Sequence, residues 1–410
     1  MTVLGRPKDV HRPTGLRSHQ WCFLLFNILL FHALLFGADL VEEYLLQPTP
    51  GVYTDAQVLD VRERARKLDL NPARDNNNIS RAYVIANPRA CLDPDLFLLA
   101  LVFSAPANAS ARDAVRRTWA NRTRVRGFPV RALFFVGPAR TPPAAVQEAL
   151  AREAERHGDV VQGRVTTTTA DSSSSSSPSG PKERVVLALR WVVAFCPAAR
   201  FVLLTRDSVF VNLPALGGYL LGLRRHPEDL YLGRVIQRDR PGRDPARPGY
   251  LPARLYPDRY LPDYCAGAAY VLSQDVVRKA YVASEAIGAP LPADVFVGLC
   301  ARKAGVAPAH SARFSGDKHI RYNDCCYRYM FSSAGMDAEG LAAAWADVGQ
   351  ADGACSLIQT YYGLVACKAL TYLDKLSFFS AQGRADPVAT PFRCQGSPAH
   401  VQISHLNVWR

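Results

Sequence analysis

A polar turn near the middle of the chain carries residue types that suit a ligand site. Phe201 to Leu204 is a continuous apolar run, typical of a parallel strand that is covered on both faces. Arg206, Asp207 and Ser208 follow it, so a single carboxylate lies between a cation and a hydroxyl group. Ligands of open α/β sheets bind at such strand ends. Two carboxylates would let this turn hold a divalent metal, and here only Asp207 is present.

A second group of charged residues opens the helix predicted over residues 111–121. Ser110 and Asp113 have the spacing of a capping box, which predicts that the helix begins directly after a strand and a short loop. Arg112 and Arg116 are four residues apart and therefore share one face of this helix. The helix dipole and two guanidinium groups can together bind an anion such as a nucleotide diphosphate. The alternative is a pair of solvated arginines, and spacing alone favours neither.

Two later segments contain a candidate catalytic base and a glycine that would let another group come close to the backbone. Asp294, in PADVFVGLC, is either a general base that deprotonates an incoming hydroxyl group or an N-terminal helix cap, and both roles can coexist. In YCAGAAYVLS, which begins at Tyr264, Gly267 suits a position where another group approaches the backbone closely. Neither segment identifies a substrate.

Four segments follow one another in the order found in one enzyme family: RDAVRRTW, the turn TRDS, YCAGAAYVLS and ADVFVGLC. In these segments the chain resembles the β-1,3-galactosyltransferase and N-acetylglucosaminyltransferase family, glycosyltransferase family 31. The resemblance implies a GT-A-like nucleotide-sugar transferase domain in which Arg112 and Arg116 help to hold a UDP-sugar. It also implies that Asp294 is the catalytic base and that Tyr264 and Gly267 lie on the acceptor side.

The resemblance, which covers Phe97 to Trp345, fails at the residues that would bind a metal. Family members bind manganese with three consecutive aspartates, where this chain has Arg206, Asp207 and Ser208. They also carry a histidine eleven residues before the tryptophan, where this chain has Ala334. A dication about 4 Å from an arginine is repelled by about 8 kcal/mol at an effective dielectric constant near 20. We therefore expect no metal cofactor, with Arg206 neutralising the donor diphosphate and Asp207 near the donor ribose or sugar; the alternative is that Arg206 is an exposed turn residue.

The elements that must position these residues alternate along the chain, which predicts an α/β domain with a mostly parallel central sheet. Two long connections interrupt the alternation: the low-complexity segment 166–180, which we expect to be a surface loop, and 236–263, which is long enough to be functional or disordered. The predicted strands cover 97–103, 132–136, 201–204 and 230–235, and the predicted helices cover 111–121, 141–158, 182–195 and 214–225.

The N-terminal region has the pattern of a single-pass type II membrane anchor. Residues 21–38 contain no formal charge and would be about 27 Å long as a helix, which nearly matches a hydrocarbon core. Basic residues precede the run and acidic residues follow it, so the positive-inside rule keeps 1–20 in the cytosol. The alternative is a cleaved signal peptide, but no small-x-small cleavage site follows. We expect a stem over 39–95 and a lumenal GT-A-like domain over 96–410.

Other features fit a lumenal location. Sequons at Asn78, Asn108 and Asn121 predict N-glycosylation. Nine of the ten cysteines follow the predicted anchor, as expected for disulfides in an oxidising compartment. The net charge of +13 comes from scattered basic residues without interleaved aromatic residues, which argues against nucleic-acid binding.

Together these features predict a Golgi membrane enzyme that transfers a sugar, with inversion and in β-1,3 linkage, from a UDP donor to a glycan on a glycoprotein or glycolipid. The competing hypothesis is a catalytically inactive family member that acts as a partner or chaperone in a complex with another glycosyltransferase, or as a glycan-binding module. Loss of the metal ligands favours the second hypothesis. Retention of Asp294 and of both helix arginines favours the first. The sequence does not identify the donor sugar or the acceptor.

Overall fold

The computed structural model describes residues 18–33, 55–70, 79, 81–137, 143–164, 181–223, 228–246, 250–288, 291–348 and 355–373. The chain divides into two units, Met1–Leu46 and Gln47–Arg410. The first unit contains helix α1 (Ser18–His32), whose large apolar side chains are exposed. Within the described ranges, no helix combines the length and the apolar character needed to span a bilayer. The predicted anchor, 21–38, extends past the described residues and stays a prediction.

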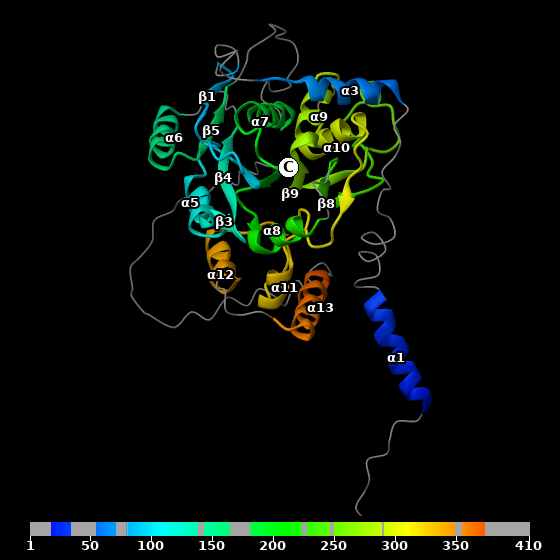
Figure 1. Ribbon diagram of the computed structural model, residues 1–410. Helices are drawn as coiled ribbons and strands as arrows, with labels where there is room; N and C mark the ends of the chain where they lie inside the picture. The colour runs from blue at the N-terminus through cyan, green and yellow to red at the C-terminus, as the bar shows by residue number, and fades with distance from the viewer. Residues whose placement is uncertain are drawn as a thin grey trace, which may run out of the picture. The chain divides into compact units, whose positions relative to one another are not determined.

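A nine-stranded mixed sheet, counted over the described residues, forms the centre of the second unit (Figure 1). The strand order is β1-β5-β4-β2-β6-β9-β8-β10, and β3 pairs with β4 beside this path. Strands β5, β4, β2, β6, β8 and β10 run in one direction, and β1 and β9 are reversed. The predicted α/β class with a mostly parallel sheet is confirmed. The strands are β1 (Tyr83–Ile85), β2 (Leu98–Ser104), β3 (Arg124–Val125), β4 (Phe128–Val136), β5 (Val160–Gly163), β6 (Phe201–Arg206), β8 (Tyr231–Ile236), β9 (Tyr264–Ser273) and β10 (Ala309–His310).

Helices cover both faces of the sheet, which explains why its central strands are apolar along their whole length. One hydrophobic cluster joins the sheet to α7 (Pro181–Phe195), α9 (Gln274–Ser284) and α10 (Ala293–Lys303), which Figure 1 shows grouped together. A second cluster joins the other face to five further α-helices among the described residues. These are α5 (Ala109–Arg117), α8 (Leu213–Gly222), α11 (Asp324–Tyr329), α12 (Ala338–Val348) and α13 (Leu357–Leu373).

The structure confirms the predicted end of one helix and corrects the predicted start of another. Helix α6 (Ala144–His157) ends at Gly158, as predicted, with the glycine in the left-handed conformation at φ 61°. Helix α5 begins at Ala109, and its N-cap residue is Asn108, whose side chain makes no capping hydrogen bond. The capping box predicted at Ser110 is therefore wrong, because the helix starts one residue before it.

Part of the predicted stem packs on the domain. Helix α3 (Ala56–Lys67) lies against α9. Arg62 forms an ion pair with Asp229 at 2.6 Å, and Arg278 of α9 donates to the carbonyl oxygen of Ala65 at 3.1 Å. The region 39–95 therefore includes a helix that is fixed to the folded unit by charged and backbone contacts.

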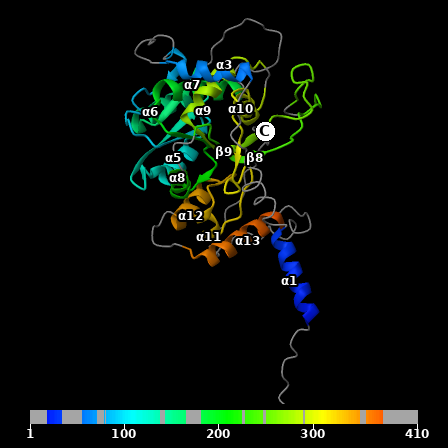
Figure 2. The same ribbon diagram turned by 45° about the vertical axis from the view of Figure 1, so that its right-hand side comes forward.

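Two disulfides link the C-terminal helices. Cys325 bonds to Cys355 and Cys326 bonds to Cys367, which ties α11 to α13 (Leu357–Leu373); Figure 2 shows the two helices side by side. The adjacent Cys325 and Cys326 do not bond to each other, which avoids the strain of a disulfide between neighbouring residues. A third disulfide, Cys91–Cys196, joins the chain before β2 to the end of α7.

Candidate active site

The Asp207 turn lies at the carboxyl ends of two neighbouring parallel strands. Phe103 of β2 pairs with Arg206 of β6, so the next residues, Ser104 and Asp207, lie beside each other at the edge of the sheet. The Ser104 hydroxyl donates to Oδ2 of Asp207 at 2.7 Å, and Nδ2 of Asn108 donates to the same oxygen at 3.1 Å. Asp207 is only 8% exposed. Its carboxylate is therefore held in one orientation by two neutral donors.

The two helix arginines share a face, as predicted, but that face meets carboxylates of the same domain. Arg112 binds Glu153 of α6 through Nε at 2.8 Å and Nη2 at 2.7 Å. Arg116 binds Glu153 at 2.6 Å and Asp159 at 2.8 Å. Burial would raise the pKa of Glu153, but hydrogen bonds from both arginines outweigh it and hold the pKa below its ordinary value.

Arg112 also fixes the loop between β2 and α5. Its side chain is fully buried, and its Nη1 donates to Ser104 Oγ at 3.0 Å and to the carbonyl oxygen of Ala105 at 2.5 Å. Its Nη2 donates to the carbonyl oxygen of Pro106 at 3.1 Å. The described contacts of Arg112 thus support the residues that hold Asp207. Direct contact of Arg112 or Arg116 with a donor diphosphate stays a prediction.

A second group of charged residues surrounds Gly267 on β9. Arg206 donates through Nε to the carbonyl oxygen of Gly267 at 3.2 Å and forms an ion pair with Asp317. A Cβ atom at position 267 would lie 3.1 Å from Asp294 Oδ2 and 3.2 Å from Arg206 Nη2. The close approach expected at Gly267 is confirmed, and it brings Asp294 and Arg206 to the same point of the sheet edge.

Asp294 has the electrostatic surroundings of a base. Burial raises its pKa; the backbone N–H of Val295 lowers it, Asp317 raises it and Arg206 lowers it, and the net effect is a pKa above the ordinary value. Helix α10 begins at Ala293 with Pro292 at the cap position, so Asp294 is in the first turn and is not the N-cap. A carboxylate with a raised pKa in a sheet-edge cluster is a typical catalytic candidate.

Tyr264, at the start of β9, connects this group to the long segment 236–263. Its hydroxyl donates to Asp239 Oδ2 at 2.8 Å. Burial, followed by the hydrogen bond to Asp239 and by the charges of Asp239, Asp294 and Asp317, raises the pKa of Tyr264. Tyr264 is therefore a neutral hydrogen-bonding group close to Asp294. Its predicted place on the acceptor side stays a prediction.

A C-terminal segment runs beside the Asp207 turn. Strand β11 (Ser332–Ser333) pairs with β7 (Phe210–Val211), and the backbone N–H of Met336 donates to the carbonyl oxygen of Ser208 at 2.9 Å. These contacts bring Ala334, the position where the resemblance places a histidine, to the turn. His319 lies against it, with Nδ1 3.1 Å from the carbonyl oxygen of Ala334.

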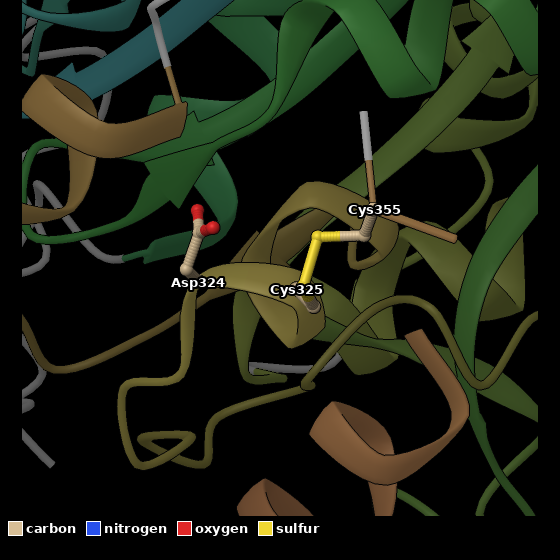
Figure 3. Close-up of side chains that lie close together, drawn as sticks. All are labelled: Asp324, Cys325 and Cys355. Carbon is tan, nitrogen blue, oxygen red and sulfur yellow. A yellow bond between two sulfur atoms is a disulfide. The ribbon is translucent and has the colours of Figure 1, made fainter. Parts of the chain in front are cut away.

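The residues present at this turn do not fit a divalent cation. The turn offers one carboxylate, already hydrogen-bonded, next to a guanidinium group. Among the described residues, one group of three brings metal-ligating atoms within reach of one another, namely Asp324, Cys325 and Cys355. Figure 3 shows that the two sulfur atoms of this group are bonded to each other, so they do not act as thiolate ligands. Absence of a metal cofactor stays a prediction.

The predicted glycosylation sites differ in their surroundings. Asn121 is exposed at the end of the short helix η3 (Trp119–Asn121). Asn108 directs its amide to Asp207. Asn78 lies outside the described residues.

The comparison with known proteins covers most of the chain. The galactosyltransferase family model matches residues 110–312. The chain is 44% identical over 367 residues to beta-1,3-galactosyltransferase 9 of Homo sapiens, which covers 89% of this chain and 94% of that relative. This chain belongs to the galactosyltransferase family. It is also similar to lactosylceramide 1,3-N-acetyl-beta-D-glucosaminyltransferase B of Xenopus laevis, at 34% identity over 71% of this chain and 76% of the relative. Beta-1,3-galactosyltransferase 4 of Rattus norvegicus is 33% identical over 71% of this chain and 85% of the relative.

As a galactosyltransferase-family member, the chain carries a glycosyltransferase domain whose match includes Arg112, Asp207 and Asp294. Ser104 and Asn108 precede the matched residues, and Asp317 follows them. Sequence reasoning missed the part that all three play around the site. Only Ser104 could have been assigned to the site from the sequence, because it directly follows a predicted strand. Asn108 was interpreted as part of a sequon, and no sequence motif surrounds Asp317.

Proposed function

We propose that this chain is an inverting glycosyltransferase that transfers a hexose from a UDP donor to a hydroxyl group of a glycan in β-1,3 linkage. The observation that carries the proposal is the convergence of Asp294, with its raised pKa, and Arg206 at Gly267, directly beyond the strand end that holds Asp207. The names of the relatives, which are galactosyltransferases and N-acetylglucosaminyltransferases acting in 1,3 linkage, support the same reaction class.

In the proposed reaction Asp294 acts as the general base. Its ionised carboxylate accepts the proton of the acceptor hydroxyl group while that oxygen forms a bond to the anomeric carbon of the donor sugar. The bond between this carbon and the diphosphate oxygen breaks at the same time, and UDP leaves with the electron pair. Burial supports this role, because it raises the proton affinity of the carboxylate.

Arg206 is proposed to bind the donor diphosphate. Its ion pair with Asp317 lies at the surface, with side chains 49% and 54% exposed. Such pairs contribute about 0–1 kcal/mol. A diphosphate carries more negative charge than one carboxylate, so it competes effectively for the guanidinium group. Asp207, held through Oδ2, presents its other oxygen to a donor hydroxyl group. Arg112 and Arg116 then act through the loop and the helix that they stabilise.

Metal independence follows from this arrangement as a further part of the proposal. Arg206 supplies the positive charge that a dication supplies elsewhere, and the single carboxylate of Asp207 is too little to hold a dication against that charge. The Golgi location, the type II membrane anchor and a glycan acceptor on a glycoprotein or glycolipid complete the proposed function. The N-terminal charge pattern and the family membership support them.

A second function is favoured by the composition of the Asp207 turn alone. A family member that lost its metal ligands can keep the fold as a partner of an active glycosyltransferase. In that case the chain binds neither UDP nor a UDP-sugar, and Asp294 has no effect on any turnover.

The experiment measures UDP release by the purified full-length protein from UDP-galactose, UDP-N-acetylglucosamine and UDP-N-acetylgalactosamine, with manganese and with a chelator. We expect turnover of one donor at the same rate in both conditions. The variant Asp294→Asn should lose about a hundredfold or more of that rate, since a general base contributes about 10²–10⁴-fold. The control Asp113→Asn removes an exposed carboxylate that pairs with Arg117, and it should leave the rate unchanged.

The outcomes separate the candidate functions. Turnover only with manganese would refute metal independence and leave the transferase intact. Absence of both turnover and a UDP-induced thermal shift would refute the enzymatic proposal and favour the partner function.

A further inference from the structure

Asn108 occupies the N-cap position of α5 without acting as a cap. Asparagine is among the preferred N-cap residues because its side-chain oxygen accepts a hydrogen bond from an early backbone N–H of the helix. Here that hydrogen bond is missing among the described contacts, and Nδ2 donates to Asp207 instead. The helix thus forgoes a cap of about 1 kcal/mol. The side chain serves the carboxylate of the neighbouring strand end.

The loop around Asn108 fixes the direction of this amide. The backbone N–H of Asn108 donates to the carbonyl oxygen of Ala105 at 3.1 Å, and the N–H of Arg112 donates to the carbonyl oxygen of Asn108 at 3.1 Å. The buried Arg112 side chain binds the carbonyl oxygens of Ala105 and Pro106 as well. These contacts hold the backbone of Asn108 in place, and the hydrogen bond from Nδ2 to Asp207 sets the direction of its carboxamide.

The same nitrogen is the acceptor atom of an N-glycosylation sequon. Asn108, Ala109 and Ser110 form the pattern Asn-x-Ser. A glycan replaces one hydrogen of Nδ2 with a bulky sugar. In the folded protein that sugar would begin within hydrogen-bonding distance of Asp207, where Nδ2 lies 3.1 Å from Oδ2. Asn108 is an exposed residue, so it is the contact of its Nδ2 with Asp207, and not burial, that would bring a glycan at Asn108 next to a donor at Asp207.

We propose that Asn108 is a positioning residue for Asp207, and that its sequon remains unglycosylated in the protein that binds the donor. The inference rests on the proposed function, because it assigns Asp207 to the donor. It adds that the carboxamide of Asn108 must stay unmodified for that binding. The sequon at Asn121 is also exposed but has no described contact with Asp207, so it is the internal control.

Two variants separate the amide from the sequon. Ser110→Ala removes the sequon and keeps the carboxamide of Asn108, on an exposed residue that the described contacts do not involve in the site. Asn108→Ala removes both. In the full-length protein from a secretory host, we expect Ser110→Ala to bind UDP like the wild type. Asn108→Ala should bind UDP at least tenfold more weakly, about 1.4 kcal/mol.

Peptide mapping after enzymatic deglycosylation in ¹⁸O-labelled water gives the second readout, on wild-type protein retained by immobilised UDP. We expect label at Asn121 and none at Asn108. Label at Asn108 in the retained protein would overturn the proposal, and so would unchanged UDP affinity in Asn108→Ala. If Asn108→Ala does not fold, the presence or absence of ¹⁸O label at Asn108 in the retained wild-type protein tests the proposal.

A third measurement distinguishes this inference from the proposed function. If neither the wild type nor Ser110→Ala binds UDP, the proposed function fails, and thermal unfolding of Asn108→Asp tests the contact with Asp207 without a ligand. Two adjacent carboxylates repel each other when both are ionised; among the described contacts Arg112 reaches Asp207 through Ser104, and the neighbouring Arg206 is paired with Asp317. The variant should lose stability relative to Ser110→Ala as the pH rises from about 4 to about 7. A pH-independent difference would refute the contact.

Discussion

The charges around Asp294 predict that two substitutions will shift the pH–rate profile in opposite directions. A base must be ionised, so activity falls as the pH drops through its raised pKa. Arg206 lowers that pKa and Asp317 raises it. Arg206→Gln should therefore move the acidic limb of the pH–rate profile to higher pH, and Asp317→Asn should move it to lower pH. Neutralising Asp317 also frees Arg206 from its ion pair, which acts in the same direction as the loss of the carboxylate.

The size of the effect follows from the geometry at Gly267. The two distances from a Cβ atom at that position place Arg206 Nη2 within about 6 Å of Asp294 Oδ2. Two unit charges at about 6 Å interact with about 0.7 kcal/mol in water and about 3 kcal/mol at an effective dielectric constant of 20. Arg206 is half exposed, so solvent screening favours a value near 1 kcal/mol, or about a fivefold change in proton affinity.

The assay is the pH dependence of kcat/KM for UDP release, which reports the free enzyme. The height of the profile also falls in Arg206→Gln, because Arg206 is proposed to contact the donor, so the position of the limb is the quantity to compare. The control Arg64→Gln removes an equal charge that pairs with Glu285, and its limb should stay in place. The electrostatic reasoning would be refuted if the acidic limb moved in the same direction in Arg206→Gln and Asp317→Asn, or if it stayed at the wild-type pH in both variants.

Three further changes have expected outcomes. Gly267→Ala should lower kcat at least tenfold with a small change in Tm, because the new methyl group separates Asp294 from Arg206 at a contact of 3.1–3.2 Å; unchanged kcat contradicts the close approach. Arg112→Ala should reduce the free energy of unfolding by about 3 kcal/mol in urea titrations, since it removes one cation from a buried ion-pair network, and a loss below about 1 kcal/mol would argue against that network. Replacing both Cys326 and Cys367 by serine should increase amide hydrogen exchange in α13 selectively, since a disulfide of this loop length contributes about 2–4 kcal/mol; unchanged exchange would show that packing alone holds the helix.

The architecture could be predicted because its signals are local. Continuous apolar runs such as Phe201 to Leu204 predicted strands covered on both faces, and β6 lies in the middle of the sheet. Alternation of runs and helical patterns predicted the parallel direction, and Gly158 predicted the end of α6. Each of these inferences needs only the conformational and burial preferences of neighbouring residues. The close approach at Gly267 was predicted in the same way, from the freedom of a residue without a side chain.

The partners of the charged residues could not be predicted. Spacing correctly placed Arg112 and Arg116 on one face, but it carried no information on Glu153, which follows Arg112 by 41 positions. The pair of Arg206 with Asp317 spans 111 positions. A charged side chain binds whichever opposite charge the fold brings within a few ångströms, and folding brings together segments far apart in the chain.

Asn108 shows, within one residue, the difference between what local sequence predicts and what packing decides. The sequence around Asn108 predicted only an N-glycosylation sequon. An asparagine at the start of a helix is by local preference an N-cap residue. Packing of β2 beside β6 placed Asp207 within reach, and a hydrogen bond to a mostly buried carboxylate, which would otherwise lose its solvation, is worth more than a cap exposed to water. Local sequence thus sets where strands and helices form. Which polar groups meet at their ends depends on the packing of the whole sheet.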